Sequence, residues 1–505
     1  MRGWGAVLAG VLACACGGDD DGDAGAVLRV IEVTPADGAT EVDLEAPVVV
    51  VFNRKVDPET VESIEIVDVE TDLEVDGTSV TLVPREPYRY LAEHEVVVGS
   101  DVRDLEGVAL ESAYSSVFTS RFRQWQPRAV LGDGIGEVVS VYPYPGPQLA
   151  GIPDGRAVAV WQHGTTDDLR VSWSIYQGDD DAWSEAAMLG QSGMPMNPQL
   201  ASVPEGWMLA AWVEETTVRS AQLDPTVDSF EEVQTVHTEE ALVSQPAAAV
   251  SSNGNAAVAF TGSSGVSVYQ RPLAGTWSGQ VVGTGTAPVV AIGNSGTVWA
   301  VWTSLEGTEV TARVFDGEAW GDAEPLWTAT GDQRTDRVRL IAGRSGTVAA
   351  WGVIRPPPDG AEIHARIHHG GAWDIDETVA TPSSAFDGNP ELAANSRGEV
   401  LLAWDDGGYG LYASWRRDGS WEPAVTLTDS LATSHPIALD GEGNAMITYS
   451  TDRSAYYLAA QDRWIDGELP LDTDLLRAAF AGADPVAIGQ QQGGDTPHLH
   501  ATIYR

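Results

Sequence analysis

The chain has 505 residues, which is more than one ordinary hydrophobic core accommodates, so two or more domains are predicted. It contains 54 Gly and 18 Trp, and 43% of its residues are hydrophobic. This turn-rich and tryptophan-rich composition predicts an all-β fold. The net charge of −46 excludes nucleic acid as a partner, because nucleic-acid binding requires a positive surface.

The N-terminus has the pattern of an export signal. Arg2 precedes a short apolar stretch, Gly5 to Ala13, which is too short to cross a bilayer as a mature helix. Cys14 and Cys16 follow this stretch and are the only cysteines in the chain. The segment resembles a bacterial lipobox, in which the cysteine after a small residue is lipidated and becomes the new N-terminus. The resemblance implies lipidation of Cys14, with Cys16 as the alternative.

Residues 1–16 are therefore predicted to be a lipoprotein signal peptide, and residues 17–26 an acidic tether. The tether carries four aspartates and no side chain that could start a core, so it is expected to be extended and flexible. No later segment is long and apolar enough to span a membrane. The expected location is outside the cytoplasm, anchored by lipid to the outer membrane or cell surface, with the periplasm as an alternative.

Residues 27–122 are predicted to form a β-sandwich of about seven short strands, because short apolar runs alternate with turn signals. Three segments are more specific than this pattern: Thr34 to Thr40, Val50 to Asp57 and Asp101 to Gly107. Together with Ser116 to Thr119 they resemble the bacterial Ig-like domain of the SbsA type. That resemblance implies a spacer or adhesion module of an exported protein, without catalytic residues.

The remaining chain, residues 123–505, is a set of repeats. The segment from Asn389 to Trp421 predicts four short strands, and its pattern recurs at spacings typical of four-stranded propeller blades, about 40–50 residues. Two series mark the repeat, an aromatic residue on the second strand and a glycine in the turn before it. The aromatic residues are Trp161, Trp212, Phe260, Trp302, Trp351, Trp404 and Tyr449, and the glycines are Gly155, Gly206, Gly254, Gly296, Gly346, Gly398, Gly443 and Gly482.

A third series, on the outer strand, predicts how the ring closes. It comprises Trp125, Trp183, Phe230, Trp277, Trp320, Trp373, Trp421 and Trp464. Trp125 precedes any inner strand, whereas the last repeat, from Arg477, has only three strands before the chain ends. The N-terminal strand is therefore expected to supply the missing fourth, which removes both free sheet edges. We predict a propeller of eight blades, with seven as the alternative, and we assign these aromatic residues to the core.

The connections predict which face of the propeller carries function. Turns between first and second strands are short, and so are those between third and fourth strands. Connections between second and third strands vary more: His163 to Asp168, Val353 to Gly360, Asp405 to Gly410 and Gln490 to Thr496. Because variable loops on a rigid scaffold often carry function, the second-to-third side is the expected working face.

Some turns between third and fourth strands resemble the Asp-box turn of sialidase-like propellers. Examples are Asp418 to Trp421 and Asp316 to Trp320, although the leading Ser and the spacing of that box are absent. A sialidase also needs three arginines that converge. Arg170, Arg339 and Arg366 are present, but nothing in the sequence brings them together, and fold analogy alone does not assign function.

Histidines supply the remaining candidates for chemistry. His498 and His500 are two residues apart on an expected strand, and His364 and His368 are four apart on another, so each pair shares one strand face. Either pair offers two metal ligands, without an identifiable third. No metal, cofactor or catalytic residue is therefore predicted.

These observations favour a cell-envelope lipoprotein whose propeller binds an unknown protein or carbohydrate ligand without catalysis. The alternatives are a sialidase-like or other glycoside hydrolase, and a purely structural envelope component. Beside the propeller ligand, the predicted partner is the membrane, through the lipid anchor.

Overall fold

The computed structural model describes residues 27–127, 129–131, 146–165, 168–178, 180–190, 195–241, 243–244, 246–335, 337–355, 360–381, 389–406, 410–429, 435–471, 474–490 and 499–504. The chain divides into two compact units, of which the first ends at Arg123 and the second begins at Gln124. Strands dominate both units, and the described helices are two short 3-10 segments, η1 (Pro58–Ser63) and η2 (Ala459–Gln461). The predicted all-β fold is confirmed. None of the described segments is a helix of the length and apolarity that crossing a membrane demands.

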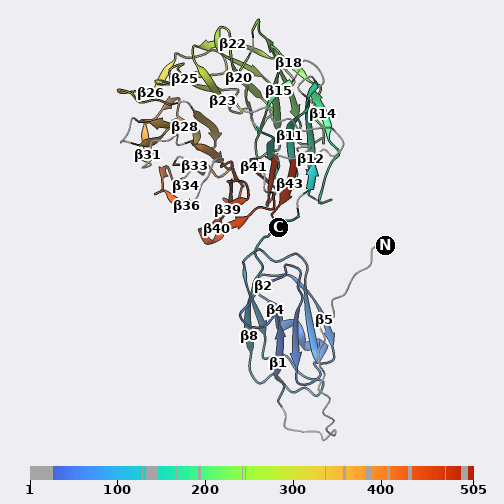
Figure 1. The fold of residues 1–505 in the computed structure, drawn as a ribbon. Helices are drawn as coiled ribbons and strands as arrows, with labels where there is room; N and C mark the ends of the chain where they lie inside the picture. The colour runs from blue at the N-terminus through green and yellow to red at the C-terminus, as the bar shows by residue number, and fades with distance from the viewer. Residues whose placement is uncertain are drawn as a thin grey trace. The chain divides into compact units, whose positions relative to one another are not determined.

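The first unit is a sandwich of two four-stranded sheets (Figure 1). Alternation on β3 buries Val48, Val50 and Phe52 in a core shared by both sheets. One sheet has the order β1 (Val30–Thr34), β3 (Val48–Phe52), β6 (Ser79–Pro84) and β5 (Thr71–Asp76). The other has the order β2 (Ala39–Val42), β8 (Tyr114–Ser120), β7 (Glu93–Val98) and β4 (Ile64–Ile66).

Two of the segments that suggested an Ig-like domain meet in this unit. Arg54 Nη1 lies 2.8 Å from Asp104 Oδ2, and the Asp104 side chain is buried. Asp104 Oδ1 also accepts hydrogen bonds from the backbone N–H groups of Glu106 and Val108. Asp104 therefore orders a turn and joins it to the Arg54 segment.

The second unit contains eight antiparallel sheets in its described part, and we number them as blades in chain order (Figure 1). Blade 1 is β10 (Gln148–Gly151), β11 (Ala157–Thr165), β12 (Asp168–Gln177) and β13 (Ala182–Trp183), with β14 (Ala187–Gly190) on β12. Blade 2 is β15 (Pro195–Ser202), β16 (Met208–Glu214), β17 (Thr217–Leu223) and β18 (Gln234–Thr238), and blade 3 is β19 (Ala247–Val250), β20 (Ala256–Gly262), β21 (Gly265–Arg271) and β22 (Ser278–Gly283). Blade 4 is β23 (Thr286–Ile292), β24 (Val298–Thr303), β25 (Glu309–Phe315) and β26 (Glu324–Thr328).

The other four blades repeat this order of strands. Blade 5 is β27 (Val338–Gly343), β28 (Gly346–Ile354), β29 (Ala361–His369) and β30 (Ala372–Trp373), with β31 (Glu377–Ala380) on β29. Blade 6 is β32 (Glu391–Ala394), β33 (Val400–Asp405), β34 (Leu411–Arg417) and β35 (Ser420–Trp421), with β36 (Val425–Thr428) on β34. Blade 7 is β37 (Ile437–Leu439), β38 (Ala445–Tyr449), β39 (Arg453–Leu458) and β40 (Arg463–Glu468), and blade 8 is β41 (Asp474–Ala481), β42 (Asp484–Gln490), β43 (Leu499–Ile503) and β9 (Ala129–Leu131).

The ring closes as predicted, through the N-terminal strand. β9 pairs with β43, with Leu131 opposite Leu499 and Ala129 opposite Ala501. The innermost strands of neighbouring blades contact one another around the whole ring, and β10 of blade 1 contacts β41 of blade 8. Blade 8 is thus built from both ends of the propeller segment, and its outer edge is paired.

The two repeat series have the structural roles that the sequence indicated. All eight turn glycines have positive φ, from +60° at Gly482 to +133° at Gly346. This region of φ disfavours side chains, which explains the glycines. The second-strand aromatic residues are almost fully buried, with at most 3% of Trp302 exposed, and they pack between blades. They belong to the core, as predicted.

Candidate functional site

The innermost strands of separate blades carry charged side chains, and two of these form an ion pair. Arg339 is the second residue of β27 and Glu391 is the first residue of β32. Arg339 holds Glu391 through two contacts, Nη2 to Oε1 at 2.7 Å and Nε to Oε2 at 3.0 Å. Each side chain remains 32% exposed. Burial raises the pKa of the Glu391 carboxyl, but Arg339, with His435 and Arg477, outweighs it and lowers that pKa.

Arg477 lies on β41 of blade 8 and adds a second cation. Its Nη1 donates a hydrogen bond to the backbone carbonyl of Leu476 at 2.7 Å. Burial lowers the pKa of the Arg477 guanidinium, Glu391 raises it, and Arg339 lowers it further. Glu391 belongs to blade 6 and Arg477 to blade 8.

Blade 7 contributes a buried histidine that contacts blade 6. His435 precedes β37 and is 4% exposed. Its Nε2 donates to the backbone carbonyl of Asn389 at 2.7 Å. Its Nδ1 lies 3.7 Å from Asp405 Oδ2 at the end of β33. We call Arg339, Glu391, Asp405, His435 and Arg477 the channel cluster.

The channel cluster lies on the side that the sequence predicted as the working face. Asp405 ends the second strand of blade 6, and Arg339 and Glu391 stand where their inner strands begin. In an antiparallel blade these points share one side of the ring. Beside them, Tyr412 donates a hydrogen bond to Asp406 Oδ2 at 3.2 Å, and burial together with Asp406 and Asp429 raises the pKa of Tyr412. Carboxylates, an imidazole and two guanidinium groups on one wall are able to bind anions and exchange protons.

The loops expected to carry function are only partly described. Residues 166–167, 356–359, 407–409 and 491–498 lie outside the described residues. The predicted loop from His163 to Asp168 is largely strand, because pairing between β11 and β12 continues to Thr165 opposite Asp168. The prediction was wrong there because backbone pairing continues where side-chain alternation is lost.

The opposite end of the channel holds a cavity of about 620 Å³ that the sequence analysis missed. Its wall comes from the ends of the innermost strands of blades 2 to 6 and the turns that follow. Much of this wall is small or apolar, and its rim carries Glu205, Asn294 and Arg344. Lining residues include Ala201, Ala249, Ala291, Ala342 and Ala394. The alanine near the end of each innermost strand is the sequence signal that indicates a wide channel.

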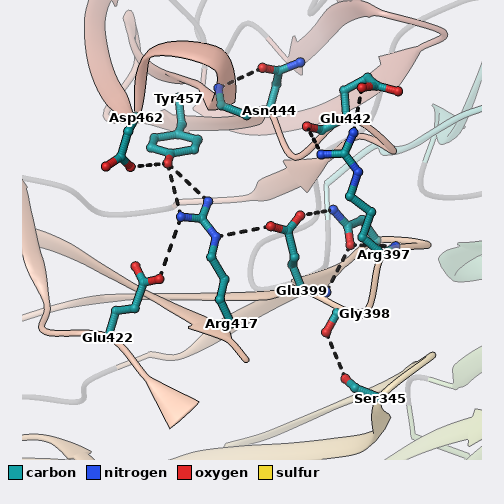
Figure 2. Close-up of polar contacts among 12 residues, drawn as sticks. Ser345, Arg397, Gly398, Glu399, Arg417, Glu422, Glu442, Asn444, Tyr457 and Asp462 are labelled. Carbon is teal, nitrogen blue, oxygen red and sulfur yellow. Dashed lines mark hydrogen bonds and ion pairs between the residues drawn. The ribbon is translucent and has the colours of Figure 1, made fainter. Parts of the chain in front are cut away.

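Charged groups beside this cavity neutralise one another (Figure 2). Arg397 Nη2 contacts Glu442 Oε2 at 2.6 Å and so joins blade 6 to blade 7. Arg417 lies 3.2 Å from Glu399 Oε1 and donates to the hydroxyl of Tyr457, also at 3.2 Å. This network links neighbouring blades, and its contacts account for its charges without a ligand.

The three arginines considered for a sialidase-like site do not converge. Arg170 on β12 contacts Met188 of the outer strand β14 in its own blade. Arg366 on β29 contacts Glu324 and the carbonyl of Leu326 on blade 4. Arg339 alone of the three lies on an innermost strand, because the other two occupy third strands. The Asp-box-like turn is structural, since Asp316 Oδ1 accepts from the backbone N–H groups of Glu318 and Ala319.

The two histidines His364 and His368 each contact different side chains and do not share a site. His364 lies between Asp376, 2.9 Å from Nδ1, and Glu362, 3.2 Å from Nε2. His368 Nδ1 accepts a hydrogen bond from Trp299 Nε1 at 2.9 Å. His500 is buried on β43, and His498 lies outside the described residues. Within the described ranges, no three His, Cys, Asp or Glu side chains are grouped to hold a metal ion.

Cys14 and Cys16, the candidates for lipidation, also lie outside the described residues, as does the acidic tether. Their assignment stays a prediction from the sequence.

Comparison with solved structures gave matches at low identity. A fungal alcohol oxidase of the AA5 family in complex with copper is 9% identical, with 76% of each chain covered and a TM-score of 0.45. An oligogalacturonate lyase from Vibrio parahaemolyticus is 10% identical, with 75% of this chain and 96% of that chain covered and a TM-score of 0.41. A mutant of Aleuria aurantia lectin with alpha-methyl-L-fucoside is 13% identical, with 59% and 99% covered and a TM-score of 0.34. Likeness at this level assigns no function.

Comparison with curated proteins gave no match. One family model matches part of the chain, that of the bacterial Ig-like domain, over residues 25–120. The first unit of this protein therefore carries a bacterial Ig-like domain.

Proposed function

We propose that this protein is an exported, lipid-anchored envelope protein whose propeller binds its ligand at the channel cluster. The Ig-like domain supports an envelope or binding role, since domains of this type are typical of extracellular and surface proteins. The N-terminal lipobox-like segment adds the anchor. The ligand is a carbohydrate or a protein segment that enters from the second-to-third side of the ring.

The channel cluster itself is the observation that carries this proposal. Four consecutive blades each carry a charged or ionisable side chain on the innermost strand or just before it: Arg339, Glu391, His435 and Arg477. The propeller core does not need them, because apolar residues already pack the blades together. Desolvated charges weaken a fold unless they are matched. Charged groups that converge at a channel therefore support a binding role.

The test is a glycan array probed with the mature full-length chain and three variants. We expect Glu391→Gln and His435→Gln to reduce binding to any glycan that the parent protein retains, because both remove groups from the channel wall. Glu442→Gln is the matched control, since its carboxylate is 79% exposed and lies in the turn network. Equal binding by all four proteins would show that the ligand does not bind at the channel cluster.

The variable loops provide a second test. Replacing residues 355–360, which follow β28, by a short Gly/Ser turn should lower binding while the far-ultraviolet circular dichroism spectrum is preserved. Unchanged binding would contradict the proposal that ligand enters past these loops. A protein that binds none of the glycans and no envelope protein would instead fit the structural alternative.

A glycoside hydrolase is the second candidate, and the same cluster provides its support. Glycosidases use two carboxyl groups at the bond to be cleaved, and Glu391 and Asp405 supply carboxyl groups near His435. The test is turnover of aryl-glycoside and sialoside substrates. Turnover above background that Glu391→Gln or Asp405→Asn abolishes would replace the binding proposal by this one, whereas no turnover is expected from a binding platform.

A further inference from the structure

Several arginines of the propeller are matched by carboxylates, whereas Arg477 is not. Arg156 contacts Asp154 and Asp228, Arg219 contacts Glu214, and Arg271 contacts Glu231. Arg477 donates to one backbone carbonyl, that of Leu476, and no carboxylate of the described residues lies within ion-pair distance of it.

The carboxylate that acts electrostatically on Arg477 is already engaged. Glu391 acts electrostatically on Arg477, but both of its carboxylate oxygens accept hydrogen bonds from Arg339. The described contacts therefore match Glu391 to Arg339 and give Arg477 no carboxylate partner. An unmatched charge withdrawn from water is costly, and removing it often stabilises a protein.

The composition of the chain favours carboxylate partners for its arginines. Asp and Glu number 74 against 28 Lys and Arg, so a carboxylate beside Arg477 would be easy to supply. The turn network at the other end of the channel shows the ordinary arrangement, in which each arginine meets a carboxylate (Figure 2). The free donors of Arg477 are therefore available to a bound group.

We infer that Arg477 receives a carboxylate of the ligand, which matches its charge as Glu391 matches that of Arg339. This inference rests on the proposed binding role of the channel cluster. A uronic acid and a peptide C-terminus share this chemistry, and a guanidinium group binds either through parallel hydrogen bonds.

The experiment is calorimetric titration of the mature full-length chain at millimolar ligand. The probes are D-glucuronate, its neutral methyl ester and N-acetylglycine, which carries the carboxylate without the sugar. We expect glucuronate to bind, its methyl ester to bind at least tenfold more weakly, and added NaCl to weaken glucuronate binding. Binding of N-acetylglycine with similar affinity would assign the recognition to the carboxylate alone, and weaker binding would show that the sugar ring contributes.

Variants separate a binding role of Arg477 from a structural one. Arg477→Gln should reduce glucuronate affinity at least tenfold, whereas the control Arg344→Gln, at the rim of the opposite cavity, should not. Arg477→Met should leave the melting temperature of the ligand-free protein unchanged or raise it, because it removes an unmatched charge. A lowered melting temperature would mean that Arg477 supports the fold, and the inference would be wrong.

Failure of this inference can be told apart from failure of the proposed function. If the methyl ester binds as tightly as glucuronate and Arg477→Gln has no effect, the channel binds a ligand but not through a carboxylate. If none of the three probes and no glycan of the array binds, both proposals fail.

Discussion

Trp125 and Tyr504 lie against each other with ring centroids 4.9 Å apart, so the first residues of the propeller unit pack on its last strand. The two residues also form an antiparallel bridge, and Trp125 Nε1 donates to Ser454 Oγ of the neighbouring blade at 3.1 Å. Closure of the ring thus depends on side-chain packing as well as on the β9 ladder.

Removing this contact should open the ring at blade 8. Trp125→Ala is expected to lower the free energy of unfolding by about 2–3 kcal/mol, somewhat less than for a fully buried tryptophan. Trp125→Phe is the control and should cost less, because it keeps the ring packing and loses the hydrogen bond to Ser454. Urea denaturation measures both, and a chain that begins at residue 145 should be less stable than one that begins at 121. Equal stability of these two chains would contradict closure by the N-terminal strand.

Substitution of a turn glycine should reveal the cost of its backbone conformation alone. Gly296 has φ +82°, and a Cβ added there would meet no atom within 4 Å. Gly296→Ala is therefore expected to cost about 1–2 kcal/mol from backbone strain alone. Gly265→Ala should cost more, since its φ is +121° and a Cβ would lie 2.3 Å from the carbonyl oxygen of Gly283. Thermal unfolding measures both, and the reverse order would be inconsistent with this account.

His364 should make the stability of the propeller depend on pH. Burial lowers the pKa of His364, but Asp376 and Glu362 outweigh it, so its pKa is raised above the ordinary value. A raised folded-state pKa gives stabilisation that is complete below the unfolded pKa and is lost as pH rises through the folded pKa. His364→Gln should therefore destabilise more at about pH 6 than at about pH 8.5.

His369 is the matched control for that prediction. It forms a comparable ion pair with Asp374, but its side chain is 58% exposed. His369→Gln should change stability little at either pH, because exposed ion pairs contribute weakly. An equal pH dependence for the two variants would show that burial between two carboxylates is not the cause.

The Arg339–Glu391 pair should have the opposite pH dependence. Burial raises the pKa of Glu391, but Arg339, His435 and Arg477 together lower it by more, so this pKa lies below its ordinary value. A depressed folded-state pKa gives stabilisation that is present above the unfolded pKa and lost as pH falls through the folded pKa. Arg339→Gln should thus raise the pKa of Glu391, measured by carboxyl carbon NMR. An unchanged pKa would mean that Arg339 does not control this carboxylate.

Lipid anchoring is tested at the cysteines. Cys14→Ser should move the protein from the membrane fraction to the soluble fraction, because the acyl chains would have no attachment point. Release by Cys16→Ser instead would identify Cys16 as the lipidated residue. Retention of both variants in the membrane fraction would contradict a lipid anchor at this site.

The sequence by itself determined the repeating parts of this protein. Turn glycines such as Gly398 and buried aromatics such as Trp404 are required in every blade for the same local reasons, positive φ and packing between sheets. Because these signals recur in every repeat, they could be recognised from the sequence. Trp125, which precedes any inner strand, indicated that the N-terminal strand closes the ring. The Ig-like domain was similarly identifiable, because Arg54 and Asp104 belong to short segments that hold its turns.

Only the tertiary structure decided which polar residues meet. Arg339, Glu391 and Arg477 are far apart in the sequence and follow no local pattern, yet the ring brings their innermost strands to one channel. The same geometry separates Arg170 and Arg366 from Arg339, because third strands lie away from the channel. Position within a blade is a local property that the sequence encodes, whereas proximity across the channel depends on how the closed ring arranges all its blades.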